Sequence, residues 1–534
     1  MWFLNILLFL KPVRLSNVKK LGIVSPYCPS HMKIQMIEVS GSRFWSTLGL
    51  AICFLTLPVQ SETVTKSGKV PNFSEDVAPI VFQNCVGCHR PGEAAPFSLL
   101  SYKDVQKHGK LITEVTGTRF MPPWHAEQGH IELLNPRMLS ADQIALFKTW
   151  YENGMPEGNP GKLPKLPTFV EGWQLGKPDL VVKMEQPWKL YAEGRDIYRN
   201  FVFPLNFTED KWVRAIEFRP CARTVVHHAL FFIDTTGTAR KMDEEDAEPG
   251  FKGGDRASRT FKPVGGWALG GNPRPLPDGL AIAYPKGSDL VIQTHFHPAG
   301  KEEEETSTVG LYFADAPPKQ TFVGIQLPPA FGEITGMDIP AGETNYLVKN
   351  SFTLPIDVEA FAISSHAHYL GKVMTMTAVL PDGKEKLLLK IPDWDFAWQE
   401  QYTFKNRVPL PKGTRLDVVM SYDNSANNPK NPANPPVRVR WGPRSNDEMG
   451  SIGLQVVAAK ETEAPILRAG LKDHVTDILI DRAIKEPKRI ALVDALFKQF
   501  DKNENGKIDD DERPALRTFI QNSPIFPPQL NNTF

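Results

Sequence analysis

The chain has 534 residues, a length typical of two to four domains. Its hydrophobic content of 41% is that of a globular protein and excludes an intrinsically disordered chain. The 61 basic and 61 acidic residues cancel and no long basic block occurs, so the sequence lacks the electrostatic signature of a nucleic-acid-binding protein.

Residues 1–61 have the character of an export signal. A short apolar run at 44–59 follows Arg43, and Val59-Gln60-Ser61 fits the small-residue rule for signal cleavage. Because positive charges follow the first apolar stretch, Met32 or Met36 is an alternative translation start. We expect an exported, periplasmic or extracellular protein with no stable membrane span after cleavage; a retained N-terminal anchor is the alternative.

Residues 72–157 are expected to form a small helical domain. The apolar spacing predicts an amphipathic helix over 72–84, and a capping box at 140–143 opens a second helix that runs through Tyr151. Between them lies Cys85-Val86-Gly87-Cys88-His89, the signature of covalent haem attachment. The two thiols would form thioethers, and His89 would bind the iron on one face.

The haem motif leaves its sixth ligand open. Met121, in Phe120-Met121-Pro122-Pro123-Trp124, is the expected ligand, and His125, His108 and His130 are the alternatives. Met155 is a weaker alternative, because it follows the final helix of the segment. A chance disulfide or half of a zinc ribbon is the competing interpretation of the two cysteines, but no second ligand pair is nearby. The segment resembles a class I cytochrome c, which implies electron transfer from an external donor that the sequence does not identify; a structural haem is the alternative.

A proline-rich linker at 158–177 precedes a long region of short, β-rich runs separated by turn residues. This pattern predicts an all-β sandwich arrangement. The region is long enough for two sandwiches, at 178–318 and 319–462, with a break near Pro317-Pro318. The predicted strands include 179–182, 225–233, 290–297, 373–380, 415–422 and 437–440.

Half of the twelve histidines lie in three pairs within this β region: His227-His228, His295-Phe296-His297 and His366-Ala367-His368. In a strand, residues two apart share a face, so a His-x-His can aim two imidazoles at one metal. Adjacent histidines face opposite sides, so the first pair needs a β-bulge or different ring nitrogens to hold one ion. Three such pairs favour copper or zinc sites over isolated surface or core histidines.

The β region resembles the copper type II, ascorbate-dependent monooxygenases, which include peptidylglycine α-hydroxylating and dopamine β-monooxygenases. The resemblance covers about 280 residues and rests on four motifs. These are Val225-Val226-His227-His228-Ala229-Leu230, Gln293-Thr294-His295-Phe296-His297-Pro298, His366-Ala367-His368-Tyr369-Leu370-Gly371-Lys372 and Asn446-Asp447-Glu448-Met449.

The resemblance implies two tandem jelly-roll-like β domains with one copper each. The electron-accepting copper would be bound by His227, His228 and His295, and the oxygen-binding copper by His366, His368 and Met449. His297 matches no primary ligand and is expected to be structural or to contact a ligand. The implied reaction is hydroxylation of a C–H bond of a small organic substrate by O₂, with a solvent-filled gap between the coppers.

The chain also departs from the family's pattern. Peptide-amidating members have an arginine two residues before the HxH, where this chain has Ser364, and Gly450-Ser451-Ile452-Gly453 lacks their substrate-binding tyrosine. Amidation of peptides is therefore not expected. The added haem segment suggests that a cytochrome replaces ascorbate and feeds electrons to the first copper.

Residues 470–522 return to helical periodicity around an acidic loop at 501–512. Oxygen donors and a glycine fall at the diagnostic positions of an EF-hand, and apolar residues flank the loop. A solvated acidic turn is the alternative. The expected calcium ligands are Asp501, Asn503, Asn505, the carbonyl of Lys507, Asp509 and Glu512.

These observations predict a multidomain oxidoreductase: a small all-α cytochrome c domain, two tandem all-β sandwiches and an EF-hand segment. The predicted function is an exported, copper-dependent monooxygenase supplied with electrons through haem c. A haem and copper electron-transfer protein that hydroxylates nothing is the alternative. A copper chaperone would explain neither the haem nor two dissimilar sites.

Overall fold

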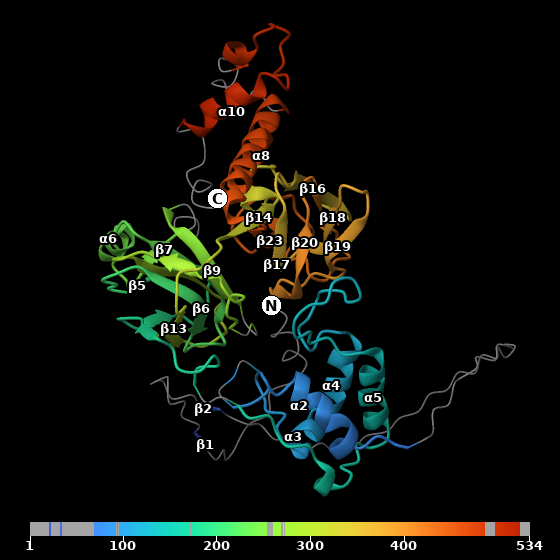
Figure 1. Cartoon of the computed structure of the whole chain (residues 1–534). Coiled ribbons are helices and arrows are strands. Elements are labelled where there is room, and N and C mark those ends of the chain that lie inside the picture. Colours follow the sequence, from blue (N-terminus) through green and yellow to red (C-terminus); the bar gives the residue numbers. More distant parts are fainter. Residues whose placement is uncertain are drawn as a thin grey trace, which may run out of the picture. The chain divides into compact units, whose positions relative to one another are not determined.

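The computed structural model describes residues 69–523, apart from 92, 94, 170–171, 254–259, 269–270, 272 and 486–496 (Figure 1). It also describes two short paired strands, β1 (Leu21–Gly22) and β2 (Lys33–Ile34). The predicted signal region otherwise lies outside the described residues. Residues 71–534 form one compact unit, and residues 1–70 form another. In the part of the chain that is described, no helix is long and apolar enough to span a bilayer.

The segment 71–157 is helical, as predicted, and has its own apolar core around Phe73, Phe147 and Trp150. The Ser140 capping box opens the last helix at the predicted position. Two helices in the middle were not predicted, although Ser101 and Asp104 form a second capping box. The elements are η1 (Phe73–Val77), α2 (Ala78–Asn84), α3 (Tyr102–Lys107), α4 (Gly109–Gly117) and α5 (Ala141–Glu152).

The linker contains one turn of 3-10 helix, η2 (Pro160–Lys162), and returns toward the start of the helical segment. Its Lys162 ammonium lies 2.6 Å from Glu75, and the Phe73 N–H donates to the carbonyl of Pro156. The proline residues prevent longer helix or strand here.

The first β region consists of two antiparallel sheets with a common apolar core that includes Phe203, Ile292 and Leu311. The strand orders are β10-β6-β13-β3 and β8-β5-β11-β7-β9, and β12 pairs separately with β4. A short helix, α6 (Thr238–Glu244), follows β7. The strands are β3 (Leu180–Lys183), β4 (Trp188–Leu190), β5 (Ile197–Pro204), β6 (Lys211–Arg219), β7 (Val226–Asp234), β8 (Phe251–Lys252), β9 (Lys262–Ala268), β10 (Ile282–Tyr284), β11 (Asp289–Phe296), β12 (Glu303–Glu305) and β13 (Thr308–Phe313).

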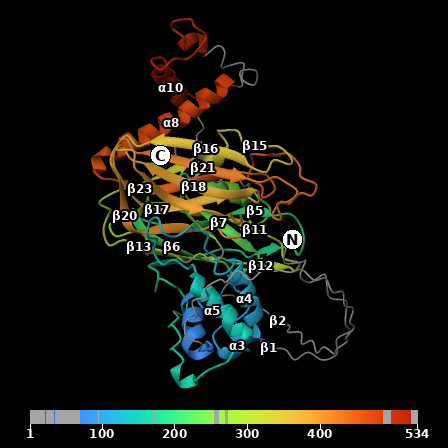
Figure 2. The same ribbon diagram turned by 90° about the vertical axis from the view of Figure 1, so that its right-hand side faces the viewer.

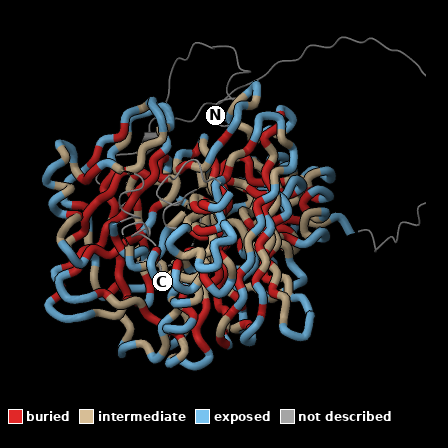
Figure 3. The backbone as a smooth tube through the Cα atoms, turned by 90° about the horizontal axis from the view of Figure 1, so that it is seen from above, coloured by how far each residue is buried: buried red, intermediate tan, exposed pale blue. Residues whose placement is uncertain are grey.

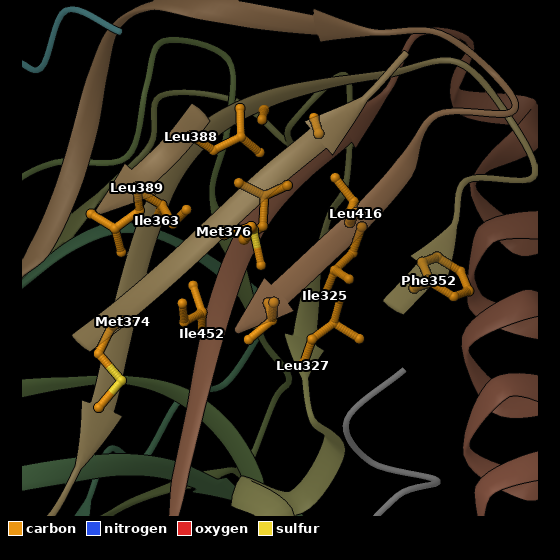
Figure 4. Close-up of a cluster of buried hydrophobic side chains, with 14 of the residues drawn as sticks. Ile325, Leu327, Phe352, Ile363, Met374, Met376, Leu388, Leu389, Leu416 and Ile452 are labelled. Carbon is orange, nitrogen blue, oxygen red and sulfur yellow. The ribbon is translucent and has the colours of Figure 1, made fainter. Parts of the chain in front are cut away.

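The second β region repeats this plan with sheets β14-β23-β17-β20 and β16-β21-β18-β19, and with a small pair, β15-β22. Side chains of both larger sheets, such as Ile363 and Met376, meet in its core (Figure 4). The elements are β14 (Phe322–Leu327), η3 (Pro329–Gly332), β15 (Asp338–Ile339), β16 (Tyr346–Thr353), β17 (Val358–Ala367), β18 (Gly371–Val379), β19 (Glu385–Ile391), β20 (Gln401–Leu410), β21 (Arg415–Tyr422), β22 (Val439–Arg440) and β23 (Gly450–Ala458).

The protein is therefore multidomain and mostly β-sandwich, with some helices, as the sequence predicts. Five of the predicted strands match β3, β7, β11, β18 and β21 to within two residues at either end. The sixth is shortened to β22, because the carbonyl of Val437 accepts a hydrogen bond from the Asn424 side chain instead of pairing in a sheet. In Figure 3 many buried stretches of the chain lie in the interior, and exposed segments lie at the periphery.

The C-terminal segment begins with η4 (Glu461–Glu463) and the long helix α8 (Ala464–Lys485), which lies against the second β region (Figure 2). Leu467 and Leu471, in the first half of α8, belong to the core of that region. In its second half, Val475 and Ile480 pack with residues around the acidic loop and α10 (Arg513–Gln521). The helix thus belongs to two hydrophobic cores.

A loop from the helical segment, residues 120–137, packs onto the second β region. The Trp124 indole is buried in the core of that region, 5.1 Å from the Tyr402 ring centroid. Leu133 forms a β-bridge with Phe404, and the Glu127 N–H donates to the carbonyl of Lys390. The loop after α4 is therefore an integral part of a β domain.

Candidate metal centres

The first histidine group lies at the end of β7 and β11. His295 pairs with His228, whereas the next residue, Phe296, pairs with Val226, so His227 is the extra residue of a β-bulge. The bulge turns two consecutive imidazoles toward one point, as the sequence required for a shared ion. The His297 N–H then donates to the carbonyl of Val225 and closes the distorted end of the ladder.

The Nδ1 atoms of the three histidines converge. The Nδ1 of His228 lies 3.1 Å from that of His227 and 3.3 Å from that of His295. Nitrogens bound tetrahedrally at about 2.0 Å from one metal are about 3.3 Å apart, so the spacing fits a metal ion. This is the only group of three or more His, Cys, Asp or Glu side chains in the described part of the chain whose ligand atoms lie within 4.8 Å of one another.

Asp196 contacts the imidazole of His295 on the side opposite the converging Nδ1 atoms. Its carboxylate lies 3.0 Å from the Nε2 of His295 and 2.8 Å from the Nδ1 of His297, and it accepts a hydrogen bond of 2.7 Å from the Ser445 hydroxyl. Partial burial raises the pKa of Asp196, but the three hydrogen bonds outweigh it and hold the pKa well below its usual range. An ionised carboxylate on Nε2 fixes the tautomer of His295 that presents a bare Nδ1 to a metal.

The second histidine pair lies at the end of β17, with ring centroids 5.2 Å apart and planes at 86°. In both residues Nδ1 is hydrogen-bonded. The Nδ1 of His366 lies 2.5 Å from the side-chain oxygen of Gln399, and that of His368 lies 3.0 Å from the carbonyl oxygen of Asp447. Both acceptors select the tautomer whose Nε2 carries a lone pair. The two sites therefore offer opposite ring nitrogens.

Met449 directly precedes β23, and its backbone is tied to that of His368 through Glu448. The buried carboxylate of Glu448 accepts from the N–H groups of His368 at 2.6 Å, Met449 at 2.9 Å and Leu370 at 3.0 Å. The pairing of His366 with Ser451 and of Ala367 with Gly450 continues toward Met449 opposite His368. The structure thus brings the backbones of the three predicted ligands together.

Two glycines allow this close packing. A Cβ at Gly450 would lie 2.1 Å from the Tyr422 hydroxyl, and one at Gly371 would lie 2.7 Å from the Trp394 ring. The Trp394 indole in turn donates to the carbonyl of His368 at 3.1 Å. Gly371 of the His366–Lys372 motif is therefore needed to leave room for Trp394, which holds the strand that carries the histidines.

One phenyl ring separates the two histidine groups. The centroid of Phe396 lies 4.9 Å from the ring of His227, 5.2 Å from that of His368 and 6.5 Å from that of His366. Phe396 is buried, with 5% of its surface exposed. In this structure a side chain therefore lies where the family resemblance implies a solvent-filled gap.

Burial keeps the histidines neutral. Desolvation, reinforced by the neighbouring imidazoles, lowers the pKa of His227 and of His368 to about 3, and that of His228 well below its usual value. Burial also lowers the pKa of His366 to about 4, although Gln399 opposes the shift. Neutral imidazole is the form that binds metals, so these side chains are ready to act as ligands at neutral pH.

The predicted haem residues follow α2. Cys85, Cys88 and His89 form one turn, in which the N–H groups of Cys88 and His89 both donate to the carbonyl of Cys85. The Nδ1 of His89 lies 3.1 Å from the carbonyl of Phe97, which leaves its Nε2 for iron, so the donor set fits a c-type haem. Burial raises the pKa of the Cys85 thiol to about 12.

The candidates for the sixth haem ligand lie in different surroundings. The Met121 N–H donates to Val115 at the end of α4, and the His108 ring stacks on Phe97 with centroids 3.9 Å apart. The imidazole of His130 meets Glu127 at 3.0 Å. The His125 Nε2 is buried and has no hydrogen-bond partner. These contacts do not choose among the four residues.

The acidic loop between residues 497–500 and α10 is closed by hydrogen bonds to its first and last expected calcium ligands. Asp501 accepts from the N–H of Gly506 at 2.7 Å, and buried Glu512 accepts from the N–H of Lys502 at 2.6 Å. Gly506 has a φ of +79°, as the sharp EF-hand turn requires. The amides of Asn503 and Asn505 donate to Asp509, and the N–H of Lys507 donates to Asn505.

Several residues of the two sites were not predicted. Asp196, Gln399 and Phe396 lie outside the histidine motifs, and only their tertiary contacts identify them. Glu448 was part of a quoted motif, but its role in fixing Met449 depends on the fold. His297, which was expected to be structural or to contact a ligand, lies against Asp196.

Comparisons with known proteins leave the family open. No family model and no curated protein matches the chain. Among solved structures, PNGase F from Flavobacterium meningosepticum is similar over 53% of this chain and 97% of its own, at 11% identity and a TM-score of 0.24. The VP2 subviral particle of infectious bursal disease virus is similar over 53% of this chain and 72% of its own, at 9% identity and a TM-score of 0.17. Similarity this distant supports no inference about activity.

Replacing Asp196 with asparagine should weaken metal binding at the three-histidine site about 10- to 100-fold, because an amide cannot accept hydrogen bonds from both imidazoles. Copper titration against a competing chelator measures the effect. The same exchange at exposed Asp315 is the matched control. An unchanged affinity in the Asp196 variant would show that the carboxylate does not orient His295.

Acidification should destabilise the metal-free protein. Folding lowers the pKa values of four histidines: His227, His228, His366 and His368. The stability that each neutral imidazole contributes is fully present above about pH 6.5, the pKa in the unfolded chain. It is lost as the pH falls toward the pKa in the folded protein, by about 1.4 kcal/mol per group and pH unit. Burial raises the pKa of Glu448 to about 8, so acidification increases the contribution of this one group to stability and opposes the effect of the four histidines. Urea denaturation at about pH 7 and about pH 5 measures the net loss; equal stability would contradict it.

Proposed function

We propose that this protein is a copper-dependent monooxygenase that hydroxylates a small organic substrate with O₂. The observation that carries the proposal is the pair of unlike histidine sites on either side of Phe396. One site presents three Nδ1 atoms, and the other presents two Nε2 atoms beside Met449. Different ligand sets suit different tasks: the three-histidine site would store an electron, and the site with Met449 would bind O₂.

The overall reaction balances as R–H + O₂ + 2e⁻ + 2H⁺ giving R–OH + H₂O. Copper at the two sites would supply one-electron redox chemistry and O₂ binding. The chain itself holds the ligands: Asp196 and Gln399 select tautomers, and Glu448 fixes the Met449 backbone. A thioether ligand from Met449 would favour the reduced ion, which is the form that meets O₂.

We also propose that haem c on Cys85 and Cys88 supplies the electrons. His89 is held by Phe97 with its Nε2 directed away from that contact, which suits an axial ligand. An ion pair of 2.7 Å joins Glu93, close to the haem motif, to Arg223, four residues before His227. This contact supports electron entry at the three-histidine site.

The alternative is an electron-transfer protein that hydroxylates nothing. Two observations favour it: Phe396 lies between the histidine groups, and Ser364 stands where peptide-amidating enzymes have their arginine. A monooxygenase incorporates one oxygen atom of O₂ into product, whereas the alternative reduces O₂ without labelling any organic molecule. Labelled dioxygen with a panel of small organic compounds separates the two.

Met449→Ala should abolish copper-dependent oxidation of the reduced protein by O₂ while leaving haem attachment intact, because it removes one ligand of the proposed O₂ site. Stopped-flow spectroscopy of the haem band measures the reoxidation, and Met242→Ala, in a satellite cluster of the first β region, is the control. Full activity of the Met449 variant would contradict the assignment of the O₂ site.

The loop 501–512 is proposed to bind one calcium ion as a structural clip. Glu512→Gln should weaken calcium binding at least about 10-fold, because the EF-hand needs a bidentate carboxylate at its last position. Isothermal titration with calcium measures the affinity, and Glu504→Gln, at a loop position that supplies no ligand side chain, is the control. Equal loss in both variants would argue against EF-hand binding; the copper and haem contents should not change.

A further inference from the structure

A small cavity lies between the loop 120–137 and the second histidine pair. It has a volume of about 10 Å³, and its lining includes His125, Trp398, Gln399 and Tyr402. This volume is that of about one water molecule. Gln399 lines the cavity and also contacts His366, so the cavity adjoins the support of a proposed metal ligand.

Among the lining residues, the buried Nε2 of His125 and the buried Nε1 of Trp398 have no hydrogen-bond partner. The Nε of Arg137 has none either, but its guanidinium is ion-paired with Glu400. Leaving such atoms buried and unsatisfied costs about 1–3 kcal/mol each. Other polar groups of His125 and Trp398 do have partners. The main-chain N–H of Trp398 donates to the carbonyl of Asp395, and the His125 ring interacts with the Asp393 backbone.

The chemistry of these atoms is that of a water site. The Trp398 indole can only donate, so it faces the oxygen of a water and excludes a cation. The contact with the Asp393 carbonyl places the His125 proton on the other nitrogen, which leaves Nε2 to accept from the water. The Gln399 oxygen has a second lone pair beside the one that meets His366. Three hydrogen bonds are the usual number for a buried water.

We propose that this cavity binds one ordered water, which accepts from Trp398 and donates to His125 and Gln399. The water links the loop 120–137 to the side chain that orients His366. His125 and Trp398 are then positioning residues for the second metal site. The inference rests on the proposed function only in treating His366 as a metal ligand.

The link also explains why a loop of the helical segment is built into the second β region. The Phe120 ring packs against Trp398 at 6.3 Å, and Arg137 pairs with Glu400 on the other side of Gln399. Arg274 also binds Glu400, at 3.0 Å. The segment 398–400 is therefore fixed at both ends, and the water supplies the polar contact between them.

The first test is direct observation of the water in the full-length protein. Selective ¹⁵N-tryptophan labelling should reveal a cross-peak between the Trp398 indole proton and a long-lived water, with the resonance assigned by Trp398→Phe. A crystal structure should place the water within hydrogen-bond distance of the three named atoms. An empty cavity, or rapid exchange of that indole proton with bulk solvent, would overturn the inference.

The second test measures copper(I) affinity in a His228→Ala background, so that the second site is titrated alone. Gln399→Leu should weaken binding about 10- to 100-fold, as expected for loss of an outer hydrogen bond to a ligand, and Gln399→Glu should restore it. Trp398→Phe should weaken binding several-fold through the water. Gln401→Leu, two residues away and exposed, is the matched control.

Equal affinities of Trp398→Phe and the unmodified background would overturn the link to His366. Detection of the water and of these affinity changes does not depend on turnover. If no product is labelled by O₂ but the water and the affinity ranking are found, the proposed function fails and the inference stands.

Discussion

The proposed second metal site depends on one buried carboxylate. Glu448 accepts three backbone hydrogen bonds, from His368, Leu370 and Met449, and so joins the end of β17 to the start of β23. Burial raises the pKa of this acid to about 8, and the three N–H donors oppose the shift only in part. The ladder between β17 and β23 already holds His366 opposite Ser451, and Glu448 extends this link to His368 and Met449. With it, their spacing is set by the same antiparallel ladder that forms the core.

The first site has a different constraint, which is the β-bulge at His227. The bulge interrupts the pairing of β7 with β11 at one position and turns adjacent imidazoles to the same side. Three bare Nδ1 atoms within 4.8 Å of each other repel one another unless a cation or proton lies between them. Asp196 orients His295, and it also accepts a hydrogen bond from Ser445 in the loop that precedes Met449. The two sites therefore share a supporting residue as well as the ring of Phe396.

Much of this could be predicted because it is encoded locally. The spacing of paired histidines, the capping box at Ser140 and the period-two strands each depend on neighbours in the sequence. The bulge at His227 was one of the two ways in which adjacent histidines could meet one ion, and the structure has it. In contrast, Asp196 lies about a hundred residues from His295, and Gln399 lies 33 residues from His366. Only the fold brings such pairs together, so their roles could not be deduced from motif spacing.

The loop 120–137 changes how the helical segment relates to the proposed metal sites. The sequence predicts a proline-rich linker at 158–177 between the helical segment and the β region, and the helical segment also makes close contacts at two other places. Glu93 pairs with Arg223 near the three-histidine site, and Trp124 is buried in the core of the second β region. A domain held at two points cannot swing freely between sites. Electron transfer in the proposed enzyme would then proceed through fixed contacts, and its rate would depend on the packing around residues 85–137 rather than on linker length.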